Sequence, residues 1–170
     1  MILLRRHARK SPAATVLQGL AAGAIGNAVF TLYQRLVQGG GEEQEPPKDW
    51  SETPEPAQVG QRVAEGVFQQ EVPLERAGLV TQVVHWVYGT TWGGLYGLVQ
   101  ESVEQPVVSG VALAGAVVAT DYTLLPAMNL YKPPWRYPAS TLAKDFGHHV
   151  VYGLSVAGAY RAIDALRRAR

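Results

Sequence analysis

The amino-acid sequence predicts an all-helical fold, a four-helix transmembrane bundle, because its charged residues are confined to short segments. No Asp, Glu, Lys or Arg occurs in residues 12–34, 77–100 or 146–160, and residues 105–131 contain only Asp121. A membrane-spanning helix needs about 20 mostly apolar residues to cross a hydrocarbon core about 30 Å thick. The four stretches approach that length and lack the charged face of a soluble amphipathic helix.

A soluble helical bundle with a glycine-rich interior is the alternative fold, since the stretches are only moderately hydrophobic. They are rich in Gly, Ala, Ser and Thr. Small residues of this kind let helices pack closely against one another in lipid. The composition therefore favours the membrane bundle, as a single domain that covers residues 1–170.

Local signals set the predicted span boundaries. Ser11 can cap a helix and Pro12 suits its first position, so the first span covers about 12–37 and ends at the glycines 39–41. The remaining spans cover about 76–99, 106–126 and 140–163. The basic segment 1–10 before the first span resembles a signal peptide. The apolar segment that follows is too long for an h-region, and no convincing cleavage site is present, so we expect an uncleaved first span.

Between the first two spans we expect an extramembrane loop over residues 39–74. Residues 42–56 are acidic and rich in proline, without hydrophobic periodicity. Residues 56–70 form a possible amphipathic helix, because Val59, Val63 and Val67 are spaced four apart with Phe68 beside them. This helix would either lie on the membrane surface or pack on the bundle as a lid.

The distribution of Lys and Arg predicts that both termini lie in the cytoplasm. Basic residues gather in segments 5–10 and 161–170, while the long first loop is acidic. Lys132, Arg136 and Lys144 in the opposite loop count against this orientation. The Trp and Tyr of segment 132–138 suit the aromatic belt at the headgroup level.

The sequence also contains an internal similarity that indicates a duplicated helical hairpin. Residues 85–89 (His-Trp-Val-Tyr-Gly) match 149–153 (His-Val-Val-Tyr-Gly), and Gly94 and Tyr96 match Gly158 and Tyr160 at the same offset. Residues 30–32 resemble 122–124 more weakly. Such a repeat would be parallel, with a pseudo-two-fold axis along the membrane normal. Chance similarity among small residues and histidines is the alternative explanation.

Taken together, these motifs resemble the YagU-like family of small bacterial inner-membrane proteins. The resemblance rests on the glycine-rich first span, His-x-x-Tyr-Gly at 85–89, Gly-Leu-Tyr-Gly at 94–97, Asp-Tyr-Thr-Leu-Leu-Pro at 121–126, Pro-Pro-Trp-x-Tyr-Pro at 133–138 and His-His-x-x-Tyr-Gly at 148–153. It covers most of the chain outside the acidic loop. It implies a multi-pass protein of the bacterial cytoplasmic membrane and a link to acid tolerance, and it supplies no catalytic residues.

Glycines four residues apart form flat faces on two predicted spans. Gly19 and Gly23 lie on the first, and Gly89, Gly93 and Gly97 lie on the second. A neighbouring backbone can approach such a face closely. We expect these glycines to mediate helix packing, either within the chain or against a partner, and we expect Gly93→Leu to disrupt assembly.

Ionisable residues inside the spans are the candidate functional residues, because they are costly in a membrane and are often retained for function. They are His85, Asp121, Asp145, His148 and His149. His85 and His149 enter from the same side to similar depths, and Asp145 shares a helix face with His148 and His149. The histidines could be structural hydrogen-bond donors, a proton or ion relay with the aspartates, or a haem b ligand pair.

The sequence predicts no enzyme activity, no nucleic-acid binding and no metal site. It contains no cysteine and no phosphate-binding loop, nucleophile elbow or His-Glu-x-x-His motif. We expect its partners to be membrane lipid, particularly at the basic tails, and other membrane subunits or a second copy. The first hypothesis is thus a non-catalytic accessory or scaffold subunit. The alternatives are proton- or ion-linked transport or acid response, and haem-based electron transfer.

Overall fold

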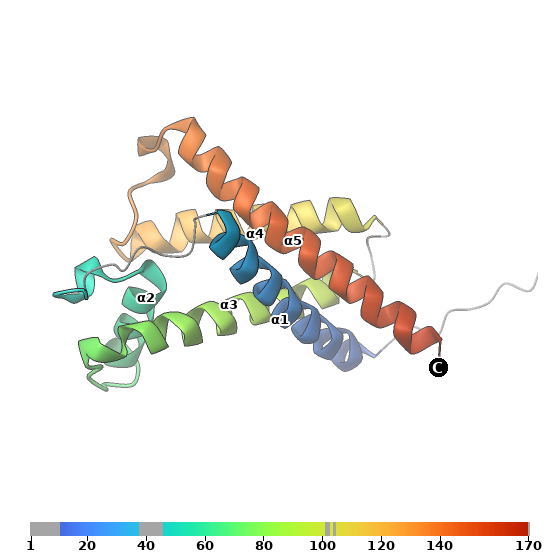
Figure 1. The fold of residues 1–170 in the computed structure, drawn as a ribbon, viewed down its shortest axis with the longest axis horizontal. Coiled ribbons are helices and arrows are strands. Elements are labelled where there is room, and N and C mark those ends of the chain that lie inside the picture. Colours follow the sequence, from blue (N-terminus) through green and yellow to red (C-terminus); the bar gives the residue numbers. More distant parts are fainter. Residues whose placement is uncertain (1–10, 38–45, 101–102, 104, 170) are drawn as a thin grey trace, which may run out of the picture.

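The computed structural model describes residues 11–37, 46–100, 103 and 105–169. Within these ranges all regular structure is helical, which confirms the all-helical prediction. Four long helices make the body of the molecule: α1 (Pro12–Val37), α3 (Ala77–Gln100), α4 (Pro106–Ala127) and α5 (Ala139–Arg168). α1 begins and α5 ends at one end of the molecule, while the short helix α2 (Glu55–Gly66) lies at the opposite end (Figure 1). The predicted basic segment 1–10 and glycine stop 39–41 lie outside the described residues.

Prolines start two of the long helices, as predicted. α1 begins at Pro12 and α4 at Pro106, where the missing N–H of proline leaves no helix hydrogen bond unmade. α5 extends to Arg168, five residues beyond the predicted end at 163, because nothing in its last turns stops a helix. Three short 3-10 helices, Trp50–Glu52, Leu74–Arg76 and Pro134–Arg136, lie in the connections.

α2 ends at Gly66, so the prediction of a helix over 56–70 was wrong at its C-terminal boundary. The backbone leaves the helix because Gln69 adopts a positive φ of 53°. The Gln70 N–H then donates to the carbonyl of Ala64 at 3.0 Å, which closes the helix C-terminus. α2 packs against α3, and a Cβ at Gly60 would lie 2.9 Å from the Val84 side chain. α2 therefore packs on the bundle through α3, as a lid would.

The four long helices are not packed symmetrically. α1 packs against both α3 and α5, and α4 packs against α5, whereas α3 and α4 make few contacts with each other. Two hairpin-like pairs, α1·α3 and α4·α5, are thus joined through α1 and α5. The other side of the bundle, between α3 and α4, stays open.

Glycines let the two helices of each hairpin-like pair approach each other closely. A Cβ at Gly93 would lie 2.5 Å from the carbonyl oxygen of Gly19 and a Cβ at Gly23 2.9 Å from that of Gly89; Gly97 also faces the α1 backbone. On the other pair, a Cβ at Gly110 would lie 2.9 Å from the carbonyl oxygen of Gly153. Backbones therefore touch directly along both pairs, and the predicted glycine faces pack within the chain.

Among the described helices, α1 and α4 are long and apolar enough, by length and composition, to cross a membrane. This is weak evidence for membrane location, and it supports two of the four predicted spans. α3 falls short even though it contains no charged residue, because glycines, His85 and Tyr88 lower its mean hydropathy. α5 also carries Lys144, Asp145 and paired histidines.

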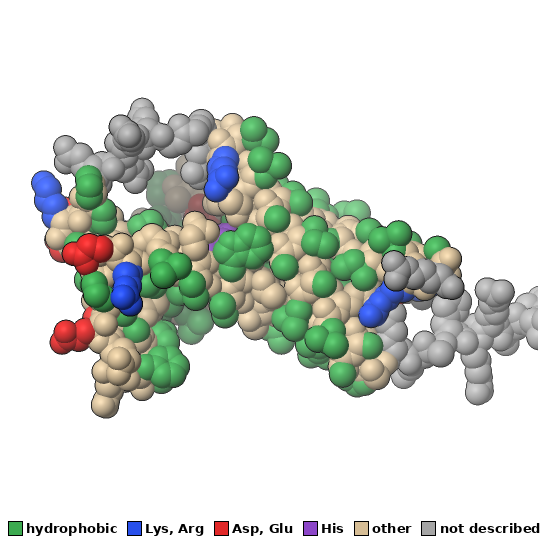
Figure 2. Space-filling view, turned by 60° about the horizontal axis from the view of Figure 1, so that its bottom comes forward, with side chains coloured by type: hydrophobic (Ala, Val, Ile, Leu, Met, Phe, Trp, Pro, Cys, Tyr) green, Lys and Arg blue, Asp and Glu red, His purple; other side chains and the backbone are tan. Residues whose placement is uncertain are grey.

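The outer surface of the bundle is nevertheless apolar. Large hydrophobic side chains are exposed on all four long helices, for example Leu32 at 58%, Val87 at 62% and Val107 at 63% exposure. Figure 2 shows hydrophobic side chains along much of the visible face, and most of the visible Lys, Arg, Asp and Glu side chains lie at the end of the molecule that carries α2. On α3 the buried residues are mainly glycines, together with Tyr96 and Gln100, and many of the exposed ones are Leu and Val. This arrangement reverses that of a soluble helix.

Candidate functional site

A cavity of about 690 Å³ lies on the open side of the bundle. Residues of α3 and α4 form its walls, α5 and α1 its floor, and the start of α2 one side of its rim. All the ionisable residues that the sequence singled out line this cavity: His85, Asp121, Asp145, His148 and His149. Three helices contribute them, so the fold brings together residues that are up to 64 positions apart in the chain.

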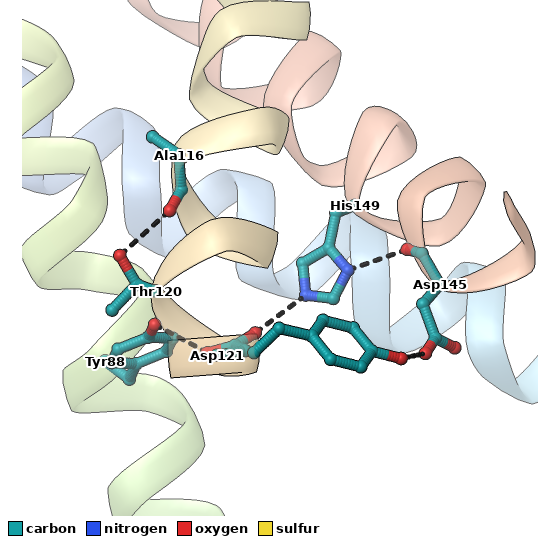
Figure 3. Close-up of polar contacts among 7 residues, drawn as sticks. Tyr88, Ala116, Thr120, Asp121, Asp145 and His149 are labelled. Atoms are coloured by element: carbon teal, nitrogen blue, oxygen red, sulfur yellow. Dashed lines mark hydrogen bonds and ion pairs between the residues drawn. The ribbon is translucent and has the colours of Figure 1, made fainter. Parts of the chain in front are cut away.

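Asp121 of α4 is held between two other helices (Figure 3). The Tyr88 hydroxyl of α3 donates to Asp121 Oδ1 at 2.7 Å. The other carboxylate oxygen, Oδ2, lies 3.4 Å from His149 Nε2 of α5. Both side chains of the Asp121–His149 pair are partly exposed to the cavity, at 22% and 25%. The Asp121 carboxylate of α4 therefore links α3 and α5 at the cavity.

The other nitrogen of His149 fixes its protonation. His149 Nδ1 lies 2.8 Å from the carbonyl oxygen of Asp145, and because a carbonyl only accepts, Nδ1 carries the proton. A neutral His149 then presents a bare Nε2 to Asp121. Two acceptors facing each other repel unless a proton lies between them. The Asp121–His149 pair is therefore built to hold one proton, on Nε2 or on Oδ2.

Asp145 continues the polar chain toward the α4 C-terminus. Its carboxylate accepts a hydrogen bond from the Tyr122 hydroxyl. The sequence predicted that the Asp145 side chain would pair with a histidine on the same helix face. Instead, His149 bonds the backbone carbonyl of Asp145, and its side-chain partner is Asp121. Among the described residues, the side chain of Asp145 pairs with Tyr122 and not with Lys144 or Arg136.

His85 and His149 both contact one ring of α1. Phe30 of α1 stacks on His85 at a ring distance of 6.0 Å and contacts His149 at 6.1 Å. His148 contacts Tyr33 edge-on at 5.8 Å. In the part of the chain that the structure describes, no group of three or more His, Asp or Glu side chains could hold a metal ion.

Aromatic residues complete the site, and the sequence analysis did not assign them a role. Tyr88 belonged to the repeat motif and Tyr122 to the weaker match, so the repeat was the signal that could have found them. Tyr131, in the connection after α4, also lines the cavity. Burial raises the pKa of Tyr131 well above its usual value, and the nearby carboxylates of Glu55, Asp145 and Asp121 raise it further.

No protein-family model, no curated protein and no solved structure matches the chain. The resemblance to YagU-like proteins therefore stays a prediction.

Proposed function

We propose that the chain is a four-span membrane protein of the cytoplasmic membrane in which proton binding at the Asp121–His149 pair is linked to transport or to an acid response. The apolar outer surface supports the membrane location, because large hydrophobic side chains are exposed on all four long helices and monomeric soluble proteins rarely expose large apolar patches. α3 supports its assignment as a span: its 24 residues rise about 36 Å at 1.5 Å per residue. His85 and Tyr88 face the cavity, while most of its Leu and Val side chains are exposed on the outer surface.

The observation that carries the functional proposal is the one-proton geometry of the Asp121–His149 pair. Histidine changes its charge near neutral pH, and the pair faces a cavity rather than a sealed core. Tyr88 and Tyr122 extend the chain of hydroxyl, carboxylate and imidazole groups on either side. The proton of the pair can therefore exchange with water in the cavity as the external pH changes.

The cavity lies at the end of the bundle that carries α2, away from the C-terminus of α5 and its Arg167 and Arg168. With both termini in the cytoplasm, as the Lys/Arg bias predicts, the cavity faces the outer side. In a bacterial cytoplasmic membrane that is the side where acid stress arrives.

The other two hypotheses have less support from the geometry. The glycine faces that suggested a scaffold subunit are occupied within the chain, so an accessory role would need a different contact surface. Haem ligation by His85 and His149 would need a free Nε2 on His149, which faces Asp121 instead.

Proton uptake by reconstituted vesicles tests the proposal. Purified protein in liposomes containing a pH-sensitive dye is exposed to an acid step. We expect faster internal acidification than in protein-free liposomes, and we expect Asp121→Asn or His149→Gln to remove the difference. Asp164→Asn is the matched control, because Asp164 bonds Arg168 at the other end of the bundle. Equal acidification by all variants would reject a role for the pair.

A further inference from the structure

We propose that the cavity binds a small organic cation, such as an alkylated amine, and that the cation exchanges with the proton of the Asp121–His149 pair. This inference names the ligand of the proposed function and rests on it for the proton that is exchanged. It is drawn from the shape, the aromatic lining and the charge of the cavity.

The volume suits one small organic ligand. About 690 Å³ lies within the roughly 300–1,000 Å³ of typical small-molecule sites. A bare metal ion or a proton needs no such space. The cavity also has a rim, made by Pro54, Glu55 and Pro56 at the start of α2, and a floor of Phe30 and Tyr152.

Aromatic rings surround the cavity from each of the long helices and from the connection after α4. They are Phe30, Tyr88, Trp92, Tyr122, Tyr131 and Tyr152. Tyr88 and Trp92 stand edge to face at 6.2 Å, so the two rings meet the cavity at different angles. The faces of such rings attract cations, most strongly in the case of tryptophan, and this attraction grows when water is excluded.

The charge of the cavity lining determines whether a positive or a negative ligand fits. Glu55, Asp121 and Asp145 line the cavity, and no lysine or arginine is among the described residues of its wall. An anion would meet carboxylates without a fixed positive partner. A neutral ligand would gain no ion pairing from them. The lining is thus complementary to a positive charge carried on an apolar body.

The cation and the proton would exchange because both interact with Asp121. The titratable groups that face the pair are Glu55 of α2, His85 and Tyr88 of α3, Tyr122 of α4, Tyr131, and Asp145, His148 and Tyr152 of α5. With its proton the pair is neutral overall, and without it the pair carries one negative charge. A bound cation favours the charged state, so one proton leaves the pair as one cation enters. The affinity for the cation should therefore rise with pH, by up to tenfold per pH unit.

Isothermal titration calorimetry of the full chain in lipid nanodiscs tests this inference, with benzyltrimethylammonium as the probe and neopentylbenzene as its uncharged isostere. Repeating the titration in buffers of different ionisation enthalpy counts the protons released. We expect the cation to bind at least tenfold more tightly than the isostere, with release of close to one proton. Asp121→Asn should weaken cation binding about tenfold and abolish the release.

Trp92→Leu should weaken binding severalfold and leave the proton release unchanged, because it removes a ring and no titratable group. Trp135→Leu is its control, since Trp135 is 80% exposed and lies outside the cavity. Equal binding of the isostere, or no cation binding while the vesicles still acidify, would overturn the inference and leave the proposed function standing. Cation binding without proton release would overturn the exchange and also contradict the proton-linked function.

Discussion

The contact between α1 and α5 and the gap between α3 and α4 would be equivalent if the chain were a symmetric duplicated hairpin. In the predicted repeat, α1 corresponds to α4 and α3 to α5. Phe30 of α1 matches Tyr122 of α4, so Gly26 and Val118, each four residues earlier, also match. Tyr152 of α5 matches Tyr88 of α3, so Val156 and Trp92, each four residues later, match as well. The same four positions therefore occur on both sides of the bundle.

On the closed side these positions hold a small pair. A Cβ at Gly26 would lie 2.5 Å from the Val156 side chain, and Val156 is completely buried. The contact is reinforced by the Gln18 side-chain amide, which donates to the Tyr160 carbonyl at 2.8 Å. On the open side the same positions hold the bulkier pair Val118 and Trp92, and both line the cavity. Small residues at these positions thus accompany direct helix packing on the closed side, and bulkier residues at the matched positions line the cavity on the open side.

The largest effect should come from Gly93→Leu, which separates α1 from α3. A side chain there would enter the Gly19 and Gly23 backbone, so overpacking should cost more than about 3 kcal/mol. We expect little folded protein by size-exclusion chromatography in mild detergent. Gly158→Leu, where a Cβ would meet nothing within 4 Å, should elute like the wild type. Equal behaviour of the two variants would contradict the packing described here.

Gly26→Val tests the closed side of the comparison. It places the larger residue of the open side against Val156, and should destabilise the fold by about 2–3 kcal/mol. Val118→Ala, at the corresponding position on the cavity wall, should cost less than about 1 kcal/mol, because it enlarges an existing space and creates no new void. Unfolding in detergent, followed by circular dichroism, measures both. A smaller loss of stability for Gly26→Val than for Val118→Ala would contradict the difference in packing between the closed and the open side.

The repeat-related tyrosines give a finer version of the same comparison. Tyr152 is buried, and its hydroxyl donates to the Gly89 carbonyl at 2.5 Å. Tyr152→Phe should cost about 1 kcal/mol. Tyr88→Phe removes the bond to Asp121 at the cavity, where water can replace the hydroxyl, and should change stability by less than about 0.5 kcal/mol. A larger loss of stability for Tyr88→Phe than for Tyr152→Phe would show that the open side contributes more to the stability of the fold than the closed side.

The helices themselves were predictable from the sequence, because long charge-free stretches and first-turn prolines are local signals. The Asp121–His149 pair was not, since spacing can only pair residues on one helix face and suggested Asp145 as the partner. The gap between α3 and α4 was also out of reach. This gap depends on the combined size of Val118 and Trp92, and these two residues line the same cavity only after all the helices have packed.

Thiol labelling in native membranes tests whether the chain forms a membrane bundle with a cavity that is open to solvent. The chain contains no cysteine, so each introduced thiol is unique. Val84 lines the cavity, while Val87, three residues later on α3, lies outside it and is 62% exposed. Only a thiolate reacts, and thiolates do not form in lipid.

We expect a membrane-impermeant maleimide added from the outer side to label Val84→Cys and to leave Val87→Cys unlabelled until the protein is unfolded in detergent. Labelling of Val87→Cys as fast as Val84→Cys would place that face of α3 in water and contradict the membrane bundle.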